Sequence, residues 1–72
     1  MKILVLKTDI KTKKMVKQVR PAFHNHPEIL DWSVDIKDID NVLRIEALDG
    51  MDEEKAIQMV KQAGHYCEAL QD

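Results

Sequence analysis

The sequence predicts an α+β fold with six elements in the order β-α-β-β-α-β. Two observations carry this prediction: short apolar or alternating segments typical of strands, and two segments with apolar residues at helical spacing. No internal repeat, linker or low-complexity segment divides the 72 residues. We therefore expect one domain spanning residues 1–72, a ferredoxin-like sandwich whose four-stranded antiparallel sheet carries both helices on one face.

The first strand and the first helix are predicted at residues 3–8 and 16–23. The strand is a nearly continuous apolar run, which suits a central position in a sheet. The helix carries Val16, Val19 and Phe23 on one face. Thr12 is the expected N-cap, because its hydroxyl can accept from a backbone N–H two or three residues on. Pro21 should kink the helix or end its regular geometry nearby.

The second and third strands are predicted from alternation of apolar and polar residues. Trp32, Val34 and Ile36 alternate with polar residues, and the segment 43–47 does the same. The polar segment 37–41 between them reads as a turn. Trp32 is expected to pack in the core.

The second helix is predicted to begin near three acidic residues at 52–54, the favourable end for negative charge. Gly64 is the expected C′ residue, and residues 66–70 read as a short last strand. The apolar stripe of this helix comprises Ala56, Met59, Val60 and Ala63. If Leu4 and Leu6 face the helices, the open face of the sheet presents Ile3 and Val5 for weak partner or dimer contact.

Segments along nearly the whole chain resemble the heavy-metal-associated domain, the fold of small copper chaperones and of cytosolic modules of metal-pumping ATPases. The matching segments are Leu6-Lys7-Thr8-Asp9-Ile10-Lys11, Val16 and Val19, Pro27-Glu28-Ile29, Trp32-Ser33-Val34-Asp35, Val60-Lys61-Gln62-Ala63-Gly64 and Tyr66. The resemblance implies a first loop that binds Cu(I) or Zn(II) through a Cys-x-x-Cys pair, since these ions prefer thiolates. Thr12 and Met15 hold those two positions here.

The resemblance therefore predicts the fold and, through this departure, argues against the family's metal chemistry. A hydroxyl is a poor ligand for Cu(I), and a single thioether binds it weakly. We expect a degenerate metal loop and no cofactor. The alternative is a divergent metal-binding or metal-transfer protein that uses Met15, His65 or Cys67. His65 should lie near Thr12 and Met15, because three loops share that end of the sheet.

The charge is divided along the chain. Residues 1–26 carry seven basic residues and one acidic residue, Asp9, whereas residues 27–72 carry four basic and twelve acidic residues. Such an asymmetry concerns partners rather than fold. We predict that Lys11, Lys13, Lys14, Lys17 and Arg20 dock an acidic protein surface. Two alternatives stay open: the lysines are simply solvated, or the helix N-terminus binds a small anion such as phosphate.

Other functions find less support in the sequence. His24 and His26 are spaced i, i+2 and face one metal only if the helix has already ended, so they are interpreted as polar residues. RNA recognition in this topology stacks bases on aromatics of the first and third strands, and neither strand has one. No membrane span, disulfide or catalytic constellation is expected. We expect a complete, cytoplasmic, non-enzymatic protein beginning at Met1.

Overall fold

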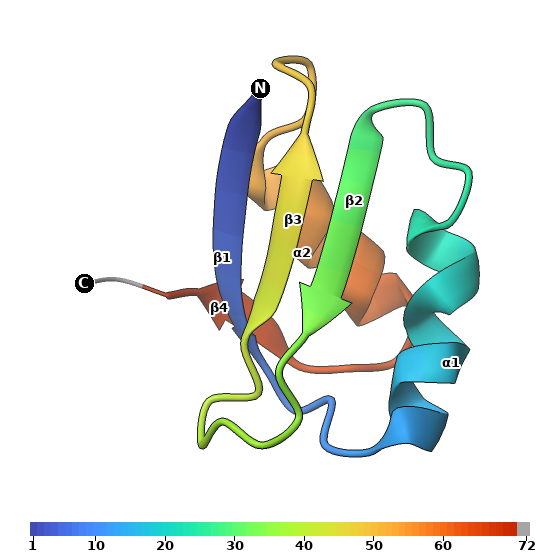
Figure 1. The fold of residues 1–72 in the computed structure, drawn as a ribbon, viewed down its shortest axis with the longest axis vertical. Coiled ribbons are helices and arrows are strands. Elements are labelled where there is room, and N and C mark those ends of the chain that lie inside the picture. The colour runs from blue at the N-terminus through green and yellow to red at the C-terminus, as the bar shows by residue number, and fades with distance from the viewer. Residues whose placement is uncertain (71–72) are drawn as a thin grey trace.

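The computed structural model describes residues 1–70 and confirms the predicted element order. Four strands form one antiparallel sheet in the order β2-β3-β1-β4, and both helices cover the same face (Figure 1). The elements are β1 Lys2–Thr8, α1 Lys13–Phe23, β2 Ile29–Val34, β3 Leu43–Ala47, α2 Glu53–Gln62 and β4 Cys67–Ala69. The predicted ferredoxin-like fold is therefore correct.

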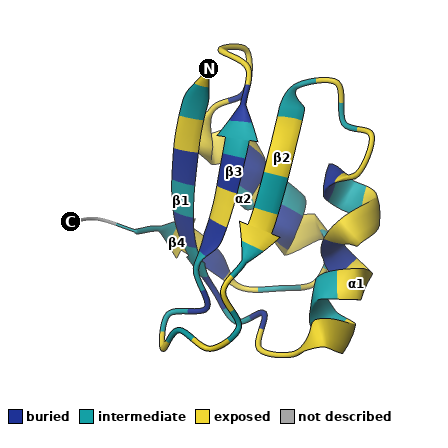
Figure 2. Cartoon of the chain, in the orientation of Figure 1, coloured by how far each residue is buried: buried dark blue, intermediate teal, exposed yellow. Residues whose placement is uncertain are grey.

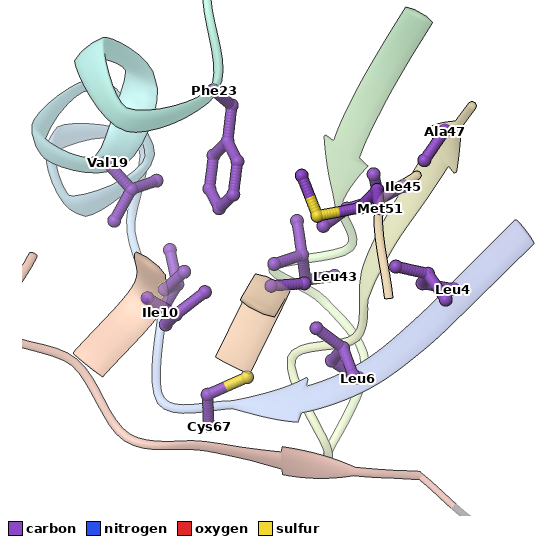
Figure 3. Packing of buried hydrophobic residues seen from close by; sticks show 12 residues of the cluster. Leu4, Leu6, Ile10, Val19, Phe23, Leu43, Ile45, Ala47, Met51 and Cys67 are labelled. Atoms are coloured by element: carbon purple, nitrogen blue, oxygen red, sulfur yellow. The ribbon is translucent and has the colours of Figure 1, made fainter. Parts of the chain in front are cut away.

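The sheet separates a buried face from an exposed one. Leu4 and Leu6 are buried beneath the helices, whereas Ile3 on the opposite face is 41% exposed (Figure 2). Strands β1 and β3 alternate in the way expected of a sheet covered on one side. Buried apolar residues form the core, which Figure 3 shows as sticks. They are Leu4, Leu6, Ile10, Val19, Phe23, Leu43, Ile45, Ala47, Met51, Ala56, Val60 and Cys67.

Helix α1 begins at its predicted cap, Thr12, and α2 begins in the acidic segment predicted for its start, where Asp52 is the N-cap. The Thr12 hydroxyl accepts from the Met15 N–H at 3.1 Å, and the Asp52 carboxylate accepts from the Lys55 N–H at 2.8 Å. Pro21 is accommodated because α1 ends two residues later at Phe23. Gly64 adopts φ +93°, the left-handed conformation expected of a C′ glycine.

Strand β2 differs from its predicted position. The strand begins at Ile29, three residues before Trp32, and Ile36 lies in the turn. The register shifts between Ile29 and Asp31, which leaves Leu30 as an extra residue in a β-bulge. The alternation of apolar and polar residues is interrupted at a bulge. It therefore predicted the strand from Trp32 onward but not the residues before it. Trp32 does pack against the core, with its ring centroid 5.2 Å from that of Phe23.

Candidate functional site

Three loops meet at the end of the sheet where β1 finishes, as the topology predicted. The Thr8 hydroxyl donates to the carbonyl oxygen of Asn41 in the β2–β3 turn at 2.6 Å. One Asp9 carboxylate oxygen, Oδ1, accepts from the Tyr66 N–H at 3.1 Å and lies 3.3 Å from Nδ1 of His65. Asp9 thus fastens the β1–α1 loop to the α2–β4 loop and fixes the point from which α1 begins.

Five exposed cations follow from this junction along the first loop and α1, and we call them the basic surface. The basic surface comprises Lys11, Lys13, Lys14, Lys17 and Arg20. Lys13, Lys17 and Arg20 are spaced i, i+4 and i+7, so they share a face of the helix. Within residues 1–70, none of the five forms an ion pair with an acidic side chain. Their charge is therefore directed to solvent rather than to the fold.

The charges in the first turn of α1 oppose the helix dipole. A helix N-terminus favours acidic side chains, yet the first turn of α1 contains Lys13 and Lys14 and no acidic residue. Helix α2 shows the reverse, with Glu53 and Glu54 in its first turn and Lys61 in its last. The first turn of α1 therefore has the unfavourable charge, whereas its last turn, with Arg20, and both ends of α2 have the favourable one.

The two positions that correspond to a cysteine pair are engaged within the loop. The Thr12 hydroxyl accepts the capping hydrogen bond from the backbone of Met15. Sδ of Met15 accepts from the Lys11 N–H at 3.4 Å, and the side chain is half-buried against the core. A hydroxyl and one thioether, each used in local packing, are a poor donor set for a soft cation.

The other two predicted metal ligands are also engaged elsewhere. His65 has Asp9 as its polar partner, and its side chain is only 10% exposed. Cys67 is 2% exposed, and Figure 3 shows its sulfur directed toward the apolar cluster. Burial raises the pKa of the Cys67 thiol to about 11, so the thiolate that binds metals is disfavoured. Among residues 1–70, no group of three or more His, Cys, Asp or Glu side chains is placed to hold a metal ion.

His24 and His26 take separate positions although α1 has ended before them. His24 is the exposed C-cap residue, and its N–H donates to the Arg20 carbonyl oxygen at 2.7 Å. His26 is half-buried, and its Nδ1 accepts from the Glu28 N–H at 3.1 Å. Asn25 between them has φ +67°, so the chain reverses at this point.

Asp9 is a loop-positioning residue that the sequence did not single out. Its signal was present as the one acidic residue in the basic N-terminal segment. Its partners, however, lie more than fifty residues away and are set by the pairing of β1 with β4.

None of the helices in the described part of the chain has the length and apolar composition needed to cross a bilayer.

The chain is similar to known proteins in structure but not in sequence. No protein-family model and no curated protein matches the chain. A copper-binding domain of HMA7, a P-type ATPase, superposes with a TM-score of 0.84 at 18% identity, covering 99% of this chain and 96% of that one. A protein from work on crosstalk between Cu(I) and Zn(II) homeostasis gives a TM-score of 0.82 at 11% identity, covering 97% and 100%.

The CsoZ metallochaperone superposes with a TM-score of 0.76 at 15% identity, covering 93% of this chain and 96% of that one. Identities this low establish shape, not activity. The chain therefore has the ferredoxin-like fold seen in copper-binding heavy-metal-associated domains and metallochaperones.

Proposed function

We propose that this chain is a small non-enzymatic binding module of heavy-metal-associated fold whose basic surface docks an acidic protein partner. The observation that carries the proposal is a set of five exposed cations, none of them in an ion pair with an acidic side chain of residues 1–70. Complementary charge steers association and sets which partners are accepted. The first-turn lysines of α1 do not stabilise the helix through its dipole, and this supports a role for them in recognition.

The proposal includes loss of the metal site. The chain has one cysteine, so it has no Cys-x-x-Cys pair. Thr12 and Met15 stand at those positions with Lys13 and Lys14 between them, and two ammonium groups oppose an incoming cation. We infer that the first loop has changed from a cation site into part of the basic surface.

Docking is tested with a synthetic polyglutamate peptide titrated into the isotopically labelled protein. We expect saturating amide shifts within residues 11–20 and loss of binding in the K13E/K14E variant. The matched control is K37E/K61E, which changes net charge equally at exposed lysines outside the basic surface. The proposal fails if both variants weaken binding alike, because attraction would then depend on net charge alone.

The alternative function is metal binding or metal transfer through Met15, His65 or Cys67, and its support is the likeness to the copper-binding domain of HMA7 and to the CsoZ metallochaperone. It is tested by titrating the reduced protein with Cu(I) and then with Zn(II). Saturating shifts confined to residues 12–15 and 65–67 would support a surviving metal site and overturn its proposed loss. A silent first loop would support the docking module.

A further inference from the structure

A groove that none of the five basic-surface residues lines follows α2. One of its hollows lies between the two helices, and the other lies between α2 and the loops that carry His26, Glu28 and Met51. These two adjoining hollows, of about 510 and 440 Å³ respectively, share His26, Met59 and Gln62. We call this the helix groove. Because the hollows share these side chains, they follow one another along α2 rather than opening on different faces.

The helix groove has an apolar floor with room in it. Met51 and Met59 lie along the α2 side, and Ala22 and Ala63 face the second hollow. The small alanines leave space between the helices that a larger side chain would fill. Methionine is unbranched and polarisable, so it adapts to apolar side chains of varied shape. Such a floor suits the apolar face of an added helix.

One end of the helix groove is acidic. Three carboxylates line it, those of Glu28, Asp52 and Glu54, against the single ammonium of Lys55. That ammonium donates to the carbonyl oxygen of Gly50 at 3.0 Å. In residues 1–70, neither Glu28 nor Glu54 forms an ion pair. Glu28 is also half-buried, so its attraction to a cation is screened less than that of an exposed carboxylate.

We propose that the helix groove binds an amphipathic helix of a partner protein that carries lysine or arginine beside its apolar face. Apolar side chains at helical spacing occupy the two hollows, and a cation meets Glu28 and Glu54. This site prefers the opposite charge to the basic surface. Binding at the helix groove can therefore be refuted without refuting the docking function proposed above.

The test uses the full chain with methyl-labelled methionine and a synthetic amphipathic helix composed of leucine and lysine. Met51 and Met59 line the helix groove, whereas Met1 and Met15 do not and serve as internal controls. We expect saturable methyl shifts at Met51 and Met59 alone. The same peptide with glutamate in place of lysine should bind at least fivefold more weakly.

Two neighbouring residues provide the matched variants. Glu54 lines the helix groove and Glu53 does not, yet both are exposed in the first turn of α2. E54K should weaken binding of the leucine–lysine helix roughly fivefold, a typical loss for reversing one close charge pair. E53K and K37E should leave binding unchanged, because neither residue lines the helix groove.

Three results would overturn the proposal. Equal weakening by E53K and E54K would mean attraction by net charge only. Shifts of similar size at Met1 and Met15 would mean adhesion without a site. Shifts at Met51 and Met59 that grow with protein concentration in the absence of peptide would show that a second copy of the chain fills the helix groove instead.

Discussion

Reversing the two first-turn lysines of α1 should make the protein more stable. Lys13 and Lys14 place positive charge at the positive end of the helix dipole, and both are exposed and unpaired within residues 1–70. The double variant K13E/K14E would replace two repulsions with two attractions. A protein selected for stability alone would already have acidic residues there, as α2 does.

The expected gain follows from the helix geometry. Each charge near a helix end contributes about 0.3–1 kcal/mol, with exposed sites at the low end. Glutamates at 13 and 14 would also lie four and three residues before Lys17, and each such pair adds about 0.2–0.5 kcal/mol. The free energy of unfolding should therefore rise by about 1–2 kcal/mol. For a domain of this size, that is a rise in Tm of roughly 5–15 °C.

The assay is thermal and urea unfolding followed by circular dichroism at low salt and again at high salt. The control is K61E, which makes the same kind of charge change in the last turn of α2, where a lysine is favourable. K61E should lower Tm while K13E/K14E raises it, and both changes should shrink with added salt. A K13E/K14E protein whose Tm is unchanged or lower would refute the claim that these lysines oppose the fold.

Three further predictions concern Thr12, Asp9 and Cys67. T12A removes the α1 N-cap and should lower the free energy of unfolding by about 1 kcal/mol, measured by urea unfolding. D9A breaks the bond to the Tyr66 N–H and should speed amide hydrogen exchange in the first loop and at Tyr66, leaving exchange in β3 unchanged. Burial raises the pKa of Cys67 from its usual 9 to about 11, so the folded state holds this proton more tightly. The stability that this provides should be complete below pH 9 and lost as pH rises toward 11, and C67A should lack that part of the pH dependence.

The fold was predictable because its signals are local. The apolar run of β1, the caps at Thr12 and Asp52, and the left-handed Gly64 each reflect chemistry within a few residues. The start of β2 was not predictable, because the bulge at Leu30 breaks the alternation from which strands are recognised. Ile10 and Met51 join the core from loops, where no periodicity marks them.

The candidate site also has features that were predictable from the sequence and features that were not. The basic surface is contiguous in sequence, so its charges can be counted directly along the chain. The contact of Asp9 with His65 and Tyr66 depends on strand pairing across the sheet, as does the burial of Cys67. The helix groove depends on the separation of two helices that lie far apart along the chain. Sequence reasoning brought three distant loops together through the topology, but it did not identify the side-chain contacts between them.

The contrast between the two helices separates what the fold needs from what the surface is for. Both helices are capped and amphipathic, and both bury their apolar stripes against the same sheet. Both ends of α2 have charges that complement its dipole, whereas α1 has such a charge only in its last turn, at Arg20. The first-turn lysines of α1, Lys13 and Lys14, are exposed and form no ion pair within residues 1–70. Their charge is repelled by the positive end of the helix dipole. A destabilising charge arrangement confined to the first turn of α1 supports the proposed docking of an acidic partner.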